Sequence, residues 1–141
     1  MPPRHWRLRV TDIPECVASS EEYTRGLDFE AFSQDSRTVK AVIRDLTVIG
    51  EAAAAIPEWL IDRHPEVPWS DMRDMRNVVV HQHFGVDLRI VWDTVRNNLP
   101  SLVEPLLQVL ASEPADETRF LVASRRGRDA YSSLAAANSS S

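Results

Sequence analysis

One short stretch, RDMRNVVVHQHF at residues 73–84, contains side chains that could do chemistry. Arg76 and His81 stand five positions apart, separated by Asn77 and three valines. A guanidinium offers a planar set of N–H donors that suits phosphate or carboxylate, and an imidazole titrates close to neutral pH. Such a pair could bind an anion and move a proton, provided that the fold brings the two groups together.

The stretch has the periodicity of an amphipathic helix, which advances by about 100° per residue. One arc is apolar and the other polar. The apolar arc holds Met72, Met75, Val78 and Val79, and the polar one holds Arg73, Asp74, Asn77 and His81. Arg76 falls at the border of the two arcs, where an ion needs a partner or a functional anion.

Arg76 and His81 diverge on such a helix by about 140°. Within one chain the two side chains cannot both contact one small group directly while the helix is unbroken. They could cooperate if the helix loosens near His81, or if a second copy of the chain supplies the missing half. This geometry is a first reason to expect a dimer.

The rest of the chain predicts an all-α fold, an antiparallel bundle of four to five helices. We expect helices over residues 10–23, with Pro14 in the opening turn, 28–32, 36–56, 71–84, 87–99 and 99–111. Ser70 or Asp71 is the expected N-cap of the helix that carries Arg76, and Asp87 caps the next one. Gly50 lies within the apolar arc of the 36–56 helix, where it would let another helix come close. Residues 1–112 are predicted to form the helical domain, and residues 113–141 a flexible, Ser-rich polar tail.

The bulk composition limits the function classes. With 141 residues and a formal net charge of −5, the chain fits one domain that does not coat nucleic acid by charge alone. A local cationic cleft on an acidic body is still allowed. Cys16, the single cysteine, excludes an internal disulfide and a four-cysteine zinc site. No apolar run reaches the roughly 20 residues that cross a bilayer, and the start does not read as a signal peptide, so we expect a cytoplasmic protein without membrane contact.

Three segments in register resemble the HEPN superfamily, and its HepT toxin branch in particular. They are VIRDLTVIGEAA in residues 42–53, the Arg-x4-His motif RNVVVH, and the surrounding PWSDMRDMRNVVVHQHFGVDLRIVW of residues 68–92. The similarity extends from about residue 10 to residue 110. Arg-x4-His alone is a weak signal, but its register with GEAA, PW and VD…VW makes the resemblance specific.

The resemblance implies the toxin of a type VII toxin–antitoxin system, a metal-independent endoribonuclease that needs no cofactor. Members of the family are two-fold homodimers whose motifs meet in a cleft at the interface, and their antitoxin is an MntA-like nucleotidyltransferase. His81 would then be the general base or acid, and Arg76 would bind the scissile phosphate. Arg73, Asn77 and Glu51 would support the RNA or the imidazole.

His83 departs from the family pattern, which continues as Arg-x4-His-x-Tyr. The tyrosine of that pattern can be modified with AMP by the antitoxin, and an imidazole is not a phenol. The antitoxin could therefore silence this chain by binding alone, another residue could accept the AMP, or the toxin role could have drifted. His83 could also join the site as a second imidazole, since it falls within about 20° of Arg76 on the helix.

Two alternatives stay open at this stage. One is a catalytically inactive HEPN module that binds a nucleotide or a partner protein. The other is a metal-dependent hydrolase, for instance with zinc held by His64, His81 and His83, although no carboxylate stands with them at ligand spacing.

Overall fold

The computed structural model describes residues 5–82 and 87–114, without the side chains of residues 78–82. These residues form seven α-helices and one π-helical segment, with no strand among them. The chain up to Val109 makes one compact unit, and a second unit starts at Leu110. The expected all-α fold is confirmed. None of the described helices combines the length and the apolar character that a bilayer crossing demands.

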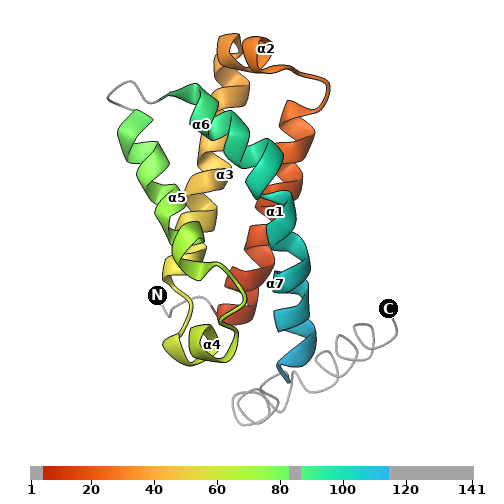
Figure 1. Ribbon diagram of the computed structural model, residues 1–141, viewed down its shortest axis with the longest axis vertical. Helices are drawn as coiled ribbons and strands as arrows, with labels where there is room; N and C mark the ends of the chain where they lie inside the picture. Colours follow the sequence, from red (N-terminus) through yellow and green to blue (C-terminus); the bar gives the residue numbers. More distant parts are fainter. Residues whose placement is uncertain (1–4, 83–86, 115–141) are drawn as a thin grey trace, which may run out of the picture. The chain divides into compact units, whose positions relative to one another are not determined.

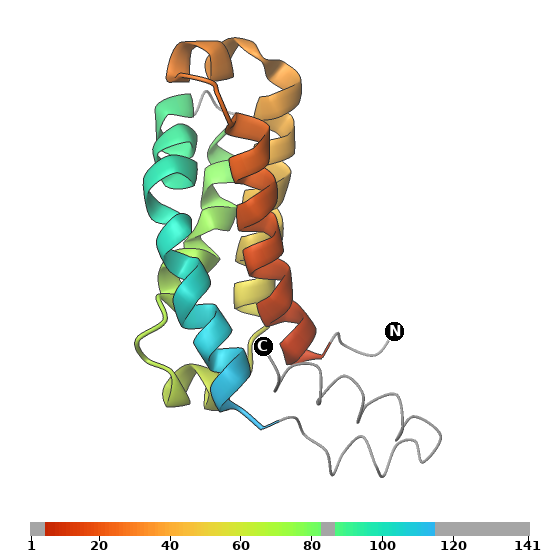
Figure 2. The ribbon, with the colours of Figure 1, turned by 90° about the vertical axis from the view of Figure 1, so that its right-hand side faces the viewer.

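Four helical rods build the first unit, and successive rods run in opposite directions (Figures 1 and 2). They are α1 (Trp6–Thr24), α3 (Ser36–Ala54), α5 (Trp69–Gln82) and a last rod made of α6 (Leu88–Asp93), η1 (Thr94–Asn98) and α7 (Pro100–Ser112). The short helices α2 (Phe29–Gln34) and α4 (Glu58–Arg63) lie in the connections at opposite ends of the bundle. Helix α3 packs against both α1 and α5, so it is the scaffold against which α5 is held.

The apolar arc predicted for α3 is the centre of the core. The residues of this arc, and Ile56 just after the helix, are all buried: Val39, Val42, Ile43, Leu46, Ile49, Ala53 and Ile56. Asp35 caps the helix by accepting a hydrogen bond from the Thr38 backbone nitrogen at 3.1 Å. The period of 3.6 residues therefore identified both the helix and its buried face.

Helix α1 begins a turn earlier than predicted. It starts at Trp6, with the ring nitrogen of His5 accepting from the Arg7 backbone nitrogen at 3.2 Å. Pro14 consequently lies inside the helix and not in its opening turn, where its missing N–H removes one bond of the helical ladder. The end agrees with expectation, because Gly26 adopts the positive φ of 78° that only glycine takes up readily.

The helix that carries Arg76 also starts earlier than predicted. Trp69 is its first residue, so Ser70 and Asp71 lie in its first turn and neither is the N-cap. The Met72 backbone nitrogen donates to the Pro68 carbonyl at 3.1 Å, which places Pro68 at the entry. Asp71 still contributes, because a carboxylate in the first turn interacts favourably with the helix dipole.

The last two predicted helices form one continuous rod. Thr94 and Leu99 keep right-handed helical torsion angles, and the Leu99 backbone nitrogen donates to the Thr94 carbonyl at 2.9 Å, an i→i−5 bond. Pro100 has no N–H for the ordinary ladder and its ring would crowd the carbonyl four residues earlier. The π-turn provides the extra room, so the rod continues where two separate helices were expected.

A buried polar cluster links α1 to α3. The Ser20 hydroxyl donates to Asp45 at 3.1 Å, and the Cys16 thiol is hydrogen-bonded to the same carboxyl group. Burial is the largest influence on Asp45 and raises its pKa, against the opposing effect of the Ser20 hydrogen bond. Burial, followed by the neighbouring Asp45, raises the pKa of the Cys16 thiol to about 12.

Candidate functional site

The exposed face of α5 carries the candidate residues that the sequence singled out. Met72 and Met75 are buried, whereas Arg73, Arg76 and Asn77 are exposed. This division follows the predicted arcs for every side chain that is described on the helix. The sequence therefore places three of the candidate polar groups on one solvent-facing surface.

Arg76 lies where α5 passes close to Gly50 of α3. A Cβ atom added to Gly50 would be 2.9 Å from the Arg76 backbone nitrogen and 3.3 Å from its Cβ, and would overlap its Cγ. Gly50 was expected to admit another helix, and the helix that it admits is α5 at Arg76. The backbone of Arg76 is thus fixed against the scaffold helix while its charged end reaches solvent.

The guanidinium of Arg76 has few bonding partners among the described residues. Its Nε donates to the Arg73 carbonyl at 3.4 Å, at the long end of hydrogen-bond distances. No carboxylate of the described residues forms an ion pair with it. A cation that is anchored at its backbone and has open N–H donors is well prepared for an anionic ligand.

Arg73 has a more mixed environment. It lines a groove between α4 and the start of α5, together with Ile61, Asp62 and Asp71. The two carboxylates offset the positive charge there. Arg73 therefore suits a flanking contact better than the main phosphate contact.

The other flank of α5 is acidic. Asp71 and Asp74 line a groove with Thr94, Asn98 and Ser101 of the last rod. Polyanions are repelled by such a surface. The cationic side of α5 is consequently the one formed by Arg73 and Arg76.

Glu51 is exposed and directly follows Gly50, so it lies beside the contact between α3 and Arg76. Asn77 directly follows Arg76 and is also exposed. Both positions remain compatible with the supporting roles that the resemblance implies.

His81 lies on the last turn of α5, which stays α-helical through Gln82. Its side chain is outside what the structure describes, and His83 lies outside the described residues altogether. Because the helix does not loosen before Gln82, Arg76 and His81 keep an angular separation of about 140° and a rise of about 7.5 Å along the axis. Of the two ways in which they could share a site, a second copy is the one that this backbone favours.

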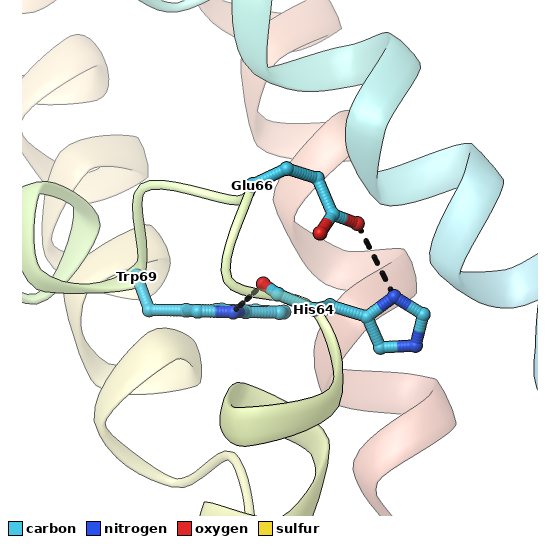
Figure 3. Close-up of polar contacts among 3 residues, drawn as sticks. All are labelled: His64, Glu66 and Trp69. Atoms are coloured by element: carbon cyan, nitrogen blue, oxygen red, sulfur yellow. Dashed lines mark hydrogen bonds and ion pairs between the residues drawn. The ribbon is translucent and has the colours of Figure 1, made fainter.

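His64 has a structural role in the connection between α4 and α5 (Figure 3). Its Nδ1 lies 3.3 Å from a carboxylate oxygen of Glu66, and its carbonyl accepts a hydrogen bond of 2.9 Å from the Trp69 indole. Trp69 is 3% exposed, so this bond satisfies a buried N–H. His64 precedes α5, whereas His81 is on its last turn, about 18 Å along the helix axis from the first residue, Trp69. The two cannot ligate one zinc ion within one chain.

Sequence reasoning missed one cationic feature, on the rod that follows α5. Arg89 and Arg96 are exposed and flank Trp92. The guanidinium carbon of Arg89 is 4.4 Å from the centre of the Phe29 ring, and that of Arg96 is 5.4 Å from the centre of the Trp92 ring. The spacing Arg-x2-Trp-x3-Arg on one helix face would have been the signal.

Comparison with known proteins identifies relatives over most of the chain. Residues 13–109 match the family model described as "Ribonuclease HepT-like". A "Probable ribonuclease HepT" of Thermococcus cleftensis is 47% identical over 93 residues, 66% of this chain and 84% of the relative. A protein of Methanocaldococcus jannaschii named "Putative RNase" is 36% identical over 110 residues, 78% of this chain and 91% of the relative. Another "Putative RNase", from Caldanaerobacter subterraneus, is 35% identical over 92 residues, 65% of this chain and 82% of the relative. No solved structure matches significantly.

Proposed function

Because the chain belongs to the HepT-like ribonuclease family, we propose that it is a metal-independent endoribonuclease that acts as the toxin of a toxin–antitoxin pair. The environment of Arg76 is the observation that best supports this proposal. Arg76 is exposed, anchored against Gly50, and faces no pairing carboxylate in the described part of the chain. It also shares α5 with His81.

RNA supplies its own nucleophile, the 2′-hydroxyl. In the proposed reaction the His81 imidazole takes the proton of that hydroxyl, the 2′-oxygen bonds to the adjacent phosphorus, and the bond from phosphorus to the 5′-oxygen breaks. The leaving oxygen is protonated from solvent. The products are a 2′,3′-cyclic phosphate end and a 5′-hydroxyl end, with no metal and no redox partner in the balance.

Arg76 stabilises the charge that builds on the phosphate oxygens in this reaction. Losing one such donor typically costs about 3–4 kcal/mol of transition-state stabilisation. Proton transfer by a positioned imidazole typically contributes ~10²–10⁴-fold.

The active site in this proposal is formed by two copies of the chain. The positions of Arg76 and His81 on an unbroken helix are about 140° apart, too far for both groups to act on one phosphate in a single copy. In a two-fold dimer, residues of α5 from both copies can face one cleft. Because the chain has a net negative charge, we expect RNA to contact a local cationic cleft and not the whole surface.

The proposed partner is an MntA-like nucleotidyltransferase antitoxin. Since His83 stands where the family has the tyrosine that accepts AMP, we expect the antitoxin to silence this chain by binding. Mass spectrometry of the co-expressed complex tests this point. An AMP adduct on His83 would show that the imidazole replaces the phenol in the modification.

The function itself is tested with purified protein and single-stranded RNA in EDTA. Cleavage that persists in EDTA and leaves 2′,3′-cyclic phosphate ends supports the proposal. Inhibition by EDTA would favour a metal-dependent hydrolase. No cleavage at all, together with no growth arrest on expression in cells, would favour a catalytically inactive binding module.

A further inference from the structure

A second cationic surface lies on α6 and η1, on the rod that follows α5. Arg89, Trp92 and Arg96 occupy positions i, i+3 and i+7, so they fall along one face. Phe29 and Phe32 of α2 pack against the same face: the Trp92 ring centre is 5.2 Å from that of Phe32 and 6.5 Å from that of Phe29. We call these five residues the α6 arginine face.

The aromatic part of the face is fixed in place. Phe32 is completely buried, and Trp92 is half-buried with two aromatic neighbours. The two guanidiniums lie over these rings, 4.4 Å from the centre of Phe29 for Arg89 and 5.4 Å from the centre of Trp92 for Arg96. Contact with an aromatic face engages the flat side of a guanidinium and leaves its N–H donors for another ligand.

Neither arginine pairs with a carboxylate in the described part of the chain. Asp87 accepts a hydrogen bond of 2.9 Å from the Arg89 backbone nitrogen and forms no ion pair with its guanidinium. Asp93 lies four residues after Arg89 and three before Arg96, which are pairing distances on a helix. Both guanidiniums lie over rings, and no ion pair joins either of them to Asp93. The face therefore presents two cations on a chain whose formal net charge is −5.

The location connects this face to the proposed active site. The last turn of α5, which carries His81, and the first turn of α6 lie at the same end of the bundle (Figure 1). Arg89 and Arg96 are about 10 Å apart along the helix. A strand that passes around this end of the bundle can meet Arg89 first and Arg96 after it.

We propose that the α6 arginine face binds the backbone of single-stranded RNA beside the scissile phosphate, with Arg89 and Arg96 each holding a phosphate. The inference rests on the proposed ribonuclease function and specifies its substrate as a strand that extends beyond the cut. Half-buried Trp92 and Phe29 orient the guanidiniums. The face recognises charge and backbone, so it contributes affinity without base selection.

The test compares two double variants that each lose two positive charges. Arg89→Gln with Arg96→Gln removes the cations of the face, whereas Arg25→Gln with Arg44→Gln removes two exposed arginines from α1's end and α3. The probe is a fluorescently labelled single strand with 2′-O-methyl groups, which cannot supply the nucleophile. Its dissociation constant is measured by anisotropy at several salt concentrations.

We expect the face variant to weaken binding about tenfold and the control to bind like the wild type. The slope of log K against log salt should become shallower by about 1.4, since each lost phosphate contact on a single strand contributes roughly 0.7. With cleavable RNA, KM should increase by a similar factor while kcat falls much less. Equal effects of the two double variants would overturn the proposal, because they would indicate general charge and not this face.

Two outcomes separate this inference from the proposed function. If the wild type cleaves RNA and the face variant binds and cleaves equally well, the inference fails and the ribonuclease stands. If the wild type binds the probe through the face but cuts no RNA, the ribonuclease fails and the RNA-binding face stands. If the face variant binds the nucleotidyltransferase more weakly and binds RNA like the wild type, the RNA-binding inference also fails. The face would then belong to a protein partner.

Discussion

Arg76 and His81 carry the chemistry at the scale of single residues, and they should fail in different ways. Arg76→Ala removes a donor to the phosphate, so we expect kcat to drop by about 10²–10³-fold. Arg76→Lys keeps the charge but loses the planar fork and should recover only part of the activity. Single-turnover cleavage of a labelled RNA measures both. Lys40→Ala, on the exposed face of α3, is the control and should cleave normally.

His81→Ala should lower the cleavage rate by about 10²–10⁴-fold while leaving RNA affinity nearly intact, because the imidazole moves a proton and is not the main phosphate contact. The remaining rate should lose the pH dependence of an imidazole. Rates from pH 5 to 8, with circular dichroism to verify folding, provide the measurement. A pure His81→Ala protein that cleaves at the wild-type rate would rule out the mechanism.

Cys16 provides a residue-scale test of the buried cluster between α1 and α3. Burial and the neighbouring Asp45 raise the pKa of its thiol to about 12. Only the thiolate reacts with alkylating reagents, so at pH 8 we expect the folded protein to react about a thousandfold more slowly than the unfolded chain. Asp45→Asn removes the adjacent negative charge and should speed the reaction of the folded protein. The rates are measured by iodoacetamide labelling followed by mass spectrometry. Equal rates for the folded and unfolded proteins would contradict the raised pKa of Cys16.

Asp45 itself makes stability depend on pH. Because burial raises its pKa in the folded state, the folded protein holds this proton more tightly than the unfolded chain. The raised pKa therefore favours folding at low pH, and this contribution is lost as pH rises through the folded pKa. Asp45→Asn should gain stability relative to the wild type at pH 7, and the gain should vanish at pH values below the usual range of a carboxyl group. Thermal unfolding of both proteins across this range measures the difference.

At the scale of helices, the packing of α3 on α5 sets the position of Arg76. Gly50→Ala adds a methyl group that overlaps the Arg76 side chain and comes within 2.9 Å of its backbone nitrogen. Overpacking typically costs about 1–3 kcal/mol, partly offset by the roughly 1 kcal/mol that alanine gains over glycine in a helix. We expect lower stability by urea unfolding and a loss of kcat that exceeds any change in KM. If the variant were as stable and as active as the wild type, Gly50 would have no positioning role.

The helices also show which parts of the fold a single sequence reveals. The apolar arc of α3, the cap at Asp87 and the end of α1 were all readable, because each depends on residues close together in the chain. The early start of α1 was missed because a histidine is not among the usual capping residues. The continuous last rod was missed because Pro100 normally signals a break, and the π-turn that accommodates it is a rare solution.

For the site, the polar arc of α5 was predictable, since one helix determines it. The contact of Gly50 with Arg76 was only half predictable: a glycine on an apolar arc indicates a close approach, but it does not say which residue approaches. The contact of Arg89 with Phe29 required the fold, because α2 and α6 are far apart in the chain, whereas Arg96 and Trp92 are four residues apart on one rod. Contacts between distant segments were thus the part that periodicity could not supply.

At the scale of the whole molecule, the decisive question is whether Arg76 and His81 act together from different copies. On one unbroken helix they diverge by about 140°, so each site should combine the arginine of one copy with the histidine of the other. A mixture of Arg76→Ala and His81→Ala proteins then contains heterodimers in which one site has lost both groups and the other has kept both. Equal mixing yields about half heterodimers, each with one of two sites intact, so we expect about a quarter of the wild-type activity.

Each variant alone has no intact site in this arrangement, which makes recovery on mixing a specific signal. The subunits are exchanged by unfolding and refolding together, and activity is compared with that of each variant refolded by itself. A heterodimer of wild type with the double variant Arg76→Ala, His81→Ala is the matched control, because neither of its shared sites keeps both groups. If the two single variants never complement each other while that control retains activity, both groups act within one copy and the shared site is wrong. A wild-type protein that stays monomeric at every concentration at which it cleaves RNA would lead to the same conclusion.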